Sequence, residues 1–100
     1  MREVRVLEAV YGDLDAGVAF YASKDARLGE YFWDCLLADI QSLSIYAGVH
    51  QPVFDCYRMI ARRFPYGIYY RVDAEVATVV AVLPLRRDPV WLNVQLNARN

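Results

Sequence analysis

Arginine is the residue type whose number and spacing most suggest chemistry in this sequence. Ten of the eleven basic residues are Arg, and the other is Lys24. A guanidinium binds carboxylates and phosphates bidentately and keeps its proton, whereas catalysis that depends on a tuned pKa more often employs lysine. The composition therefore favours binding of an anionic partner over proton transfer. Six of the arginines lie in one stretch: Arg58, Arg62, Arg63, Arg71, Arg86 and Arg87.

Charge is unevenly divided along the chain, although the formal net charge is only −1. Residues 1–57 carry a net charge of −5 and residues 58–87 a net charge of +4. A net charge so close to zero argues against a protein that coats nucleic acid through many phosphate contacts. If the arginines lie on neighbouring strands, they form a surface for an anion or an acidic partner. The alternative is a solvated face whose arginines pair with the acidic residues of the first half.

Other chemistry-bearing residues occur singly. His50 is the only histidine, which excludes a multi-histidine metal site, and we expect it to be a loop residue. Cys35 and Cys56 lack a CxxC spacing and are expected to be reduced thiols. Asp34 and Asp39 lie outside the apolar stripe of a predicted helix, and we expect them to be solvent-exposed charges that aid solubility. With no phosphate loop, GxGxxG or HExxH motif, we expect no catalytic residues, metal or cofactor.

The length of 100 residues predicts one domain spanning residues 1–100, since two independent cores would need more chain. Alternating residues predict a strand at residues 2–7, and a helix should run from Asp13 or Asp15 to Ser23. Apolar residues at three- and four-residue spacing predict a helix over Leu28–Leu43. These two helices should form an antiparallel hairpin, followed by a loop over Tyr46–Pro52.

The second half changes to a period of two, which predicts strands. We expect strands at Val53–Arg63, Tyr66–Val72 and Val76–Leu83, a corner at Phe64-Pro65, a turn at Asp73–Glu75, and a last helix that begins at Pro89 after Asp88. The predicted fold class is α+β, β-α-α-β-β-β, with an antiparallel-rich sheet packed on a helical hairpin and a short C-terminal helical segment. The longest apolar stretch is too short for the roughly 20 residues of a membrane span. Without an export signal, we expect a cytoplasmic protein with no membrane partner.

A longer combination of motifs resembles the RelE/ParE toxin superfamily. It consists of Arg62-Arg63-Phe64-Pro65-Tyr66-Gly67-Ile68-Tyr69-Tyr70, then Val80-Ala81-Val82-Leu83, and finally Arg86-Arg87-Asp88-Pro89-Val90-Trp91. The helical hairpin matches as well, so the resemblance covers about residues 2–92. It implies the toxin of a bacterial type II toxin–antitoxin module, neutralised by a cognate antitoxin protein.

The resemblance implies one of two activities. RelE-like toxins cleave mRNA in the ribosome with several basic residues and a tyrosine, and the matching positions here hold Arg58, Ile60, Gly67, Leu85 and Trp91. Only Arg58 is cationic, and an indole cannot exchange a proton as a phenol does. The sequence therefore favours the ParE-like branch, which inhibits DNA gyrase by binding it. The alternatives are a ribosome-dependent mRNA endonuclease with a rearranged basic site and a non-toxic relative that only binds antitoxin.

We expect the target and the antitoxin to bind one surface. Its candidate residues are Arg58, Arg62, Arg63, Arg86, Arg87 and Trp91, while Phe64, Pro65, Tyr66 and Tyr70 are expected to form the structural part of the motif. The antitoxin would supply acidic groups to the arginines. Whether the toxin also forms a homodimer is left open by the sequence.

Overall fold

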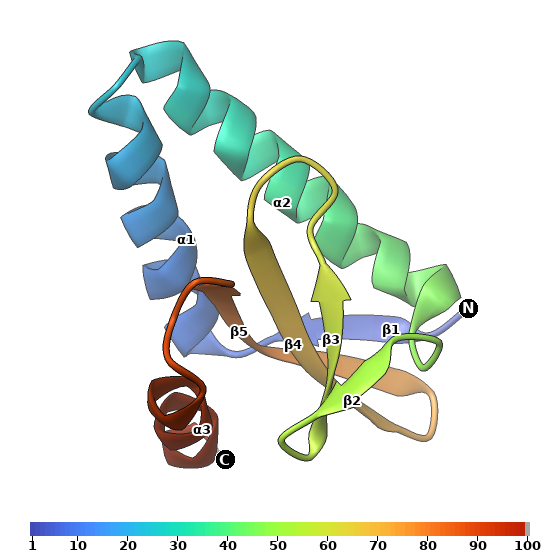
Figure 1. The fold of residues 1–100 in the computed structure, drawn as a ribbon. Coiled ribbons are helices and arrows are strands. Elements are labelled where there is room, and N and C mark those ends of the chain that lie inside the picture. Colours follow the sequence, from blue (N-terminus) through green and yellow to red (C-terminus); the bar gives the residue numbers. More distant parts are fainter. Residues whose placement is uncertain (100) are drawn as a thin grey trace.

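The computed structural model describes residues 1–99, in which a mixed sheet is combined with three helices (Figure 1). The elements follow in the order β1 (Glu3–Val6), α1 (Glu8–Ala22), α2 (Ala26–Tyr46), β2 (Gln51–Val53), β3 (Cys56–Ile60), β4 (Tyr66–Asp73), β5 (Val76–Pro84) and α3 (Pro89–Ala98). The strand order in the sheet is β1-β5-β4-β3-β2. Strand β1 runs parallel to β5, and the other neighbours are antiparallel. The expected α+β class, helical hairpin and C-terminal helix are confirmed.

Helix α2 buries the stripe that its sequence predicts. Phe32, Leu36 and Leu43 are fully buried, because their spacing of three or four residues keeps them on one side of a helix. The helix starts two residues earlier than expected, where the Asp25 carboxylate accepts a hydrogen bond from the backbone N–H of Arg27 at 2.9 Å. Such an N-cap satisfies one of the free N–H groups of the first turn.

Helix α1 begins earlier than the sequence indicated, at Glu8 instead of Asp13 or Asp15. Gly12 lies within the helix and does not end the preceding strand. An internal glycine costs about 1 kcal/mol relative to alanine, and the complete burial of Val10 and Leu14 outweighs that cost.

The expected single strand over Val53–Arg63 is wrong. The chain turns at Phe54 and Asp55, whose φ angles are 52° and 65°, and it pairs β2 with β3 as a tight hairpin. Two successive residues with positive φ are what a two-residue hairpin turn of matching twist requires. Because β3 then ends at Ile60, Arg62 lies in a loop and does not share a strand face with Arg58.

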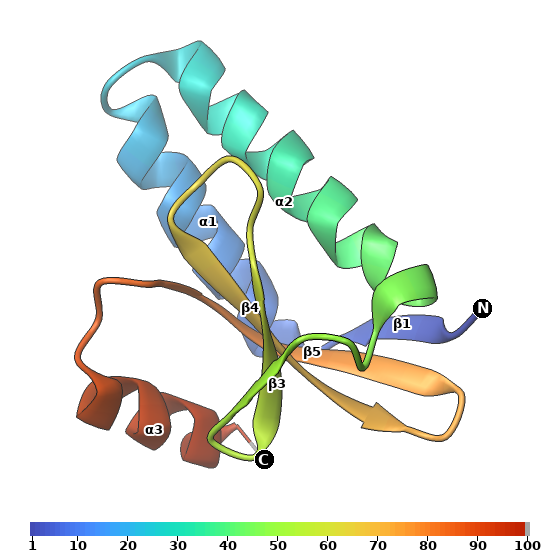
Figure 2. The ribbon, with the colours of Figure 1, turned by 45° about the vertical axis from the view of Figure 1, so that its right-hand side comes forward.

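The sheet has a core on each face. On one face Ile68, Tyr70 and Val79 pack with the buried stripes of α1 and α2. On the other face Tyr69 and its neighbours pack under α3, and Figure 2 shows α3 across the sheet from the helical hairpin. The buried residues of this second core are Cys56, Tyr69, Val80, Ala81, Leu83, Leu92 and Leu96. The expectation that β5 is apolar on both faces is confirmed. Within residues 1–99, no helix has both the length and the apolar character needed to cross a bilayer.

Candidate binding site

Two arginine-bearing loops lie beside each other at one end of the sheet. Arg62 and Arg63 follow β3, and Arg86 and Arg87 follow β5. The backbone N–H of Leu85 donates to the carbonyl of Pro65 at 3.0 Å, which joins the two loops. All four arginine side chains are exposed. These four guanidiniums thus come to the same end of the sheet from loops, whereas Arg58 and Arg71 lie on strands β3 and β4.

The loop after β3 is attached to helix α2. The carboxylate of Asp39 accepts a hydrogen bond from the backbone N–H of Arg62 at 3.0 Å, and Asp39 is only 5% exposed. Arg62 and Arg63 line a shallow cavity of about 180 Å³ with Cys35, Ala38 and Asp39. The expectation that Asp39 is a solubilising charge is therefore wrong, because its carboxylate orients this loop. Asp34, in contrast, is exposed as expected.

Arg87 stacks on the first turn of α3. Its guanidinium carbon lies 4.6 Å from the centre of the Trp91 ring, which is within the range of a cation–π contact. The helix begins at Pro89, where the Asp88 side chain accepts from the backbone N–H of Val90 at 2.7 Å, as the sequence predicts. Arg87 and Trp91 consequently present one amphipathic surface, with a planar cation over a half-buried indole.

Arg58 lies on the α3 face of β3, beside Tyr69 and over Gly67. The strand register pairs Arg58 with Tyr69, and Ile60 with Gly67. A Cβ atom added to Gly67 would lie 3.1 Å from Arg58 Cδ and 3.1 Å from the Tyr69 hydroxyl oxygen. Arg58 Nε and the Tyr69 hydroxyl are both buried, and neither has a hydrogen-bond partner among the described residues. Tyr69 is not among the site residues predicted from the sequence, although the alternation of β4 places it on the face opposite to Tyr66 and Tyr70.

The remaining motif residues lie on the helical side of the sheet. Phe64 and Tyr66 pack edge-on against Phe32, with ring centres 5.0 and 4.9 Å apart, respectively. Pro65 between them is exposed. These contacts fix the corner between β3 and β4 against α2, so Phe64 and Tyr66 position the arginine loop without forming part of its surface.

Tyr70 connects the sheet to the loop before β2. Its hydroxyl accepts from the backbone N–H of Gly48 at 2.9 Å and forms a hydrogen bond with His50 Nδ1. Burial lowers the pKa of His50 and raises the pKa of Tyr70. His50 therefore belongs to a partly buried structural contact on the face opposite to Arg58.

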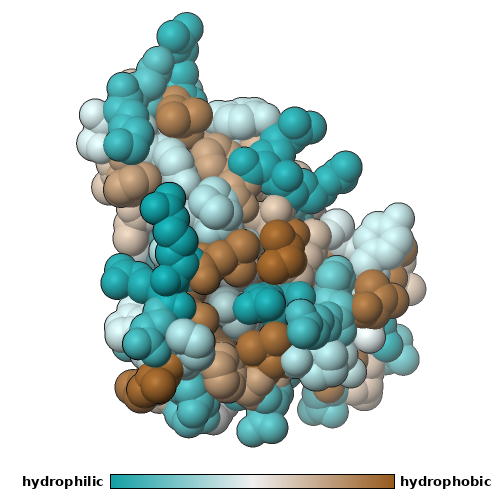
Figure 3. Space-filling view, in the orientation of Figure 1, coloured by the Kyte–Doolittle hydropathy of each residue, from teal (hydrophilic) through white to brown (hydrophobic). Residues whose placement is uncertain are grey.

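The four loop arginines and Arg58 retain their capacity to bind an anion. Within residues 1–99, none of Arg58, Arg62, Arg63, Arg86 and Arg87 forms an ion pair; the pairs present are Arg5–Glu3, Arg27–Asp25 and Arg99–Asp13. The acidic residues of the helices line a separate groove between α1 and α2: Asp15, Glu30 and Asp34. Intrachain pairing with the acidic helices is thus not what the structure shows. Figure 3 shows hydrophobic surface between α3 and β3, with hydrophilic side chains on both sides.

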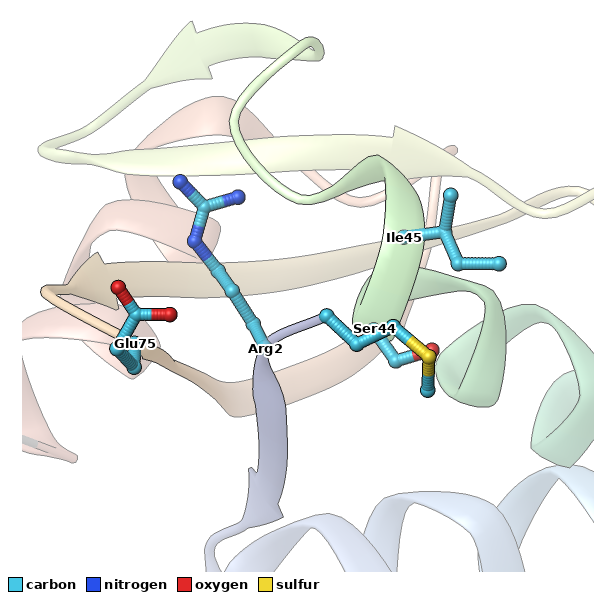
Figure 4. A pocket seen from close by; sticks show the side chains of 5 residues that line it. Arg2, Ser44, Ile45 and Glu75 are labelled. Carbon is cyan, nitrogen blue, oxygen red and sulfur yellow. The ribbon is translucent and has the colours of Figure 1, made fainter.

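Another hollow lies where β1 begins, lined by Met1, Arg2, Ser44, Ile45 and Glu75 (Figure 4). Its arginine is already engaged, because Arg2 donates to the carbonyl of Ala47 at 2.7 Å and to that of Ala74 at 3.4 Å. This hollow therefore has less capacity for an anion than the arginine-bearing end of the sheet. Among residues 1–99, no cluster of three histidine, cysteine or acidic side chains is arranged to hold a metal ion.

The helical hairpin on a mixed sheet has the α+β architecture that the sequence predicts. Among solved structures, a chain of the chromosomal ParDE toxin–antitoxin system from P. aeruginosa is similar, with a TM-score of 0.78 and 16% sequence identity. The match covers 86% of this chain and 98% of that chain. At this identity the likeness is one of fold, and it confirms the expected α+β architecture. No protein-family model matches the sequence, and no curated protein matches it.

Proposed function

We propose that this chain is the toxin of a type II toxin–antitoxin module and that it acts by binding a cellular protein. The observation that carries the proposal is the fold shared with a chain of a ParDE toxin–antitoxin system over nearly the whole length of both chains. The unpaired arginines add to it, since a surface of guanidiniums without intrachain carboxylates is suited to an acidic protein partner.

The geometry gives little support to mRNA cleavage. A metal-free ribonuclease must activate a 2′-hydroxyl, stabilise a charged phosphorane and protonate a leaving oxygen. Of the positions that match the RelE-like catalytic groups, Arg58 supplies a single cation, Ile60 is an exposed aliphatic side chain and Gly67 has no side chain. The nearby phenol of Tyr69 is buried and has no acid or base partner among the described residues.

DNA gyrase is the proposed target, as for ParE-like toxins. The docking surface consists of the arginine loops and the start of α3, where Arg87 and Trp91 combine a cation with an aromatic ring. Arginine and tryptophan are the residue types that most often dominate the binding energy of protein interfaces. A cognate antitoxin that covers this surface would block access of the target.

The test compares two activities of the purified protein. We expect inhibition of gyrase-catalysed supercoiling, and intact mRNA in a translation reaction that contains the same amount of protein. The double variant Arg87→Ala with Trp91→Ala should lose inhibition, whereas Arg27→Ala, in the first turn of α2, should retain it. Cleaved transcripts together with normal supercoiling would instead establish the ribosome-dependent endonuclease. A double variant that still inhibits gyrase would reject the proposed surface.

A further inference from the structure

Two hydrogen-bond donors are buried next to each other without an acceptor. Arg58 Nε and the hydroxyl of Tyr69 have no partner among residues 1–99, and Tyr69 is 0% exposed. Buried polar groups in folded proteins nearly always have a partner, because an unmade hydrogen bond is not compensated by water. A phenylalanine would fill the same space without this cost, so the hydroxyl is better explained by a use outside the isolated chain.

The strand register holds both donors at one place. Arg58 and Tyr69 are directly opposed on β3 and β4, and a Cβ at Gly67 would lie 3.1 Å from Arg58 Cδ, the atom bonded to Nε, and 3.1 Å from the Tyr69 hydroxyl oxygen. Any larger residue than glycine would occupy the space between the guanidinium stem and the phenol. The glycine therefore leaves the space between the Arg58 stem and the Tyr69 phenol free of its own side chain.

The chemistry of the donors selects an anion. The Nε–H of an arginine only donates, and a phenol donates when its partner is a stronger acceptor. A carboxylate has two oxygens and can accept from both donors at once, and a charge-assisted bond to the guanidinium is stronger than a neutral one.

The surroundings favour a protein carboxylate over a nucleic-acid phosphate. Ile60, Val90 and Val94, on β3 and α3, are respectively 50%, 72% and 57% exposed. Figure 3 shows hydrophobic surface on the face between these two elements. A phosphodiester chain would instead need a continuous row of cations. An acidic side chain with apolar neighbours matches both the donors and this apolar border.

The guanidinium of Arg58 provides the access. Arg58 is half-exposed, and its Nη2 is bonded only at 3.4 Å to the side-chain oxygen of Gln51. Such a long bond is weak and exchanges readily for a better acceptor. An incoming carboxylate can bind the exposed part of the guanidinium first and then take the buried donors.

We propose that Arg58 and Tyr69 form a receptor, over Gly67, for one Asp or Glu side chain of the protein partner. This inference rests on the proposed function, in which the partner is the antitoxin or the target. Within it, Tyr69 is the residue that distinguishes a specific acidic side chain from general attraction to the arginine surface.

The test measures binding and stability in the same variants. The probe is N-acetylglutamate amide. N-acetylglutamine amide is the uncharged control of the same shape, and dimethyl phosphate represents the phosphate group of a nucleic acid. We expect the acidic probe to shift the Arg58 Nε–H resonance in a saturable titration by NMR, and the uncharged probe not to shift it. Tyr69→Phe, followed at the same resonance, and Arg58→Lys, followed at backbone amide resonances of β3 and β4, should each weaken the apparent affinity by about 10- to 100-fold, consistent with loss of one hydrogen bond to a charged group. Arg62→Lys should leave it within about twofold.

A neighbouring tyrosine supplies the stability control. Tyr69→Phe should be at least as stable to urea as the wild type, because it removes an unpaired hydroxyl, whereas Tyr70→Phe should be less stable, because it removes a bonded one. A Tyr69→Phe variant that is destabilised like Tyr70→Phe would show a structural role and overturn the inference. Equal shifts with the glutamine probe, or tighter binding of dimethyl phosphate, would overturn it as well.

The proposed function and this inference fail in different ways. Gyrase inhibition without any shift of Arg58 Nε–H by the acidic probe would reject the receptor and leave the toxin assignment standing. A saturable shift in a protein that neither inhibits gyrase nor slows growth on induction would reject the toxic activity and leave a receptor for an acidic partner.

Discussion

Asp39 shows how a single buried carboxylate positions a functional loop. It stands among exposed acidic residues on α2, yet its oxygen receives the backbone N–H of Arg62 and thereby fixes where the arginine loop leaves β3. Composition and helical spacing could not reveal this, because the partner is a backbone group 23 residues away. The period of the helix places Asp39 near Ile40 and Leu43, which was the available signal that it is not wholly solvated.

We predict that Asp39→Ala destabilises the protein by about 1–3 kcal/mol, since it leaves the N–H of Arg62 without its acceptor. Asp34→Ala is the matched control, because the same substitution on the same helix removes an exposed carboxylate. Urea denaturation of the two variants measures the difference. Equal midpoints for Asp39→Ala and Asp34→Ala would contradict the role given to Asp39.

Ala74 occupies a backbone conformation that disfavours alanine. Its φ is 53°, in the turn that joins β4 to β5. A residue with a Cβ in this left-handed region costs roughly 1 kcal/mol relative to glycine. We therefore predict that Ala74→Gly stabilises the fold by about 0.5–1 kcal/mol, whereas Ala16→Gly, on the exposed side of α1, destabilises it by about 1 kcal/mol. Thermal unfolding of both variants should show shifts of opposite sign.

His50 is predicted to make stability depend on pH. Burial lowers the pKa of His50, and the hydroxyl of Tyr70 and the guanidinium of Arg2 lie on its side of the sheet. Below a pH of about 6.5 the unfolded chain takes up a proton that folded His50 resists. The stabilisation present above that pH is therefore lost as the pH falls from about 6.5 through the lower pKa of the folded state. Urea midpoints between pH 7.5 and 5.0 should fall further for the wild type than for His50→Gln, and parallel curves would contradict this.

At the scale of elements, α3 is attached to the rest of the molecule by both apolar and ionic contacts. Leu92 and Leu96 cover the sheet, and Arg99 at the end of the helix pairs with Asp13 of α1 at 2.5 and 2.8 Å. The same two side chains bind the otherwise unpaired edge of β5, where Asp13 accepts from the N–H of Val82 and Arg99 donates to the carbonyl of Val80. The ion pair thus closes a strand edge that β1 is too short to cover.

We predict that Arg99→Met destabilises the protein by about 3 kcal/mol, because the pair is largely buried and its loss leaves the Asp13 carboxylate without its cation. The double variant with Asp13→Asn should be less destabilised than the sum of the single changes. Arg27→Met breaks an exposed pair and should change little. Hydrogen exchange should be accelerated in α3 before the centre of the sheet, and uniform acceleration would contradict a local attachment.

The sequence predicted elements well where one period dominated. The apolar spacing of α2 and the apolar run of β5 gave their type and nearly their bounds. The sequence-based prediction failed at short turns. The turn between β2 and β3 is formed by Phe54 and Asp55 and contains neither glycine nor proline, so this hairpin was not apparent. Gly12 suggested a break in the chain, but helix α1 accommodates it. Of the candidate site, the arginines were predictable from their number, but the juxtaposition of Arg58 with Tyr69 depends on strand register, which no short motif encodes.

For the whole molecule, folding turns a division of charge along the sequence into a division in space. Exposed acidic side chains line the groove between α1 and α2, and five arginines without intrachain carboxylates gather at one end of the sheet and on its α3 face. A field of this kind orients an acidic partner as it approaches, although the net charge is near zero. The arginine end would meet the partner first, and the acidic helices would face away.

This arrangement limits how strongly the free protein binds nucleic acid, which separates a protein-binding toxin from one that holds RNA by itself. If these five arginines alone contact it, the logarithm of the affinity for a 20-nucleotide single-stranded RNA should fall with the logarithm of salt with a slope no steeper than about −3.5. Replacing Arg62 and Arg63 by Ser should flatten the slope by about 1.4, whereas Arg27→Ser should not change it. Fluorescence anisotropy between 50 and 200 mM salt provides the measurement. A steeper slope would mean that further cations of the molecule contact RNA, and the separation of charge described above would then not govern its choice of partner.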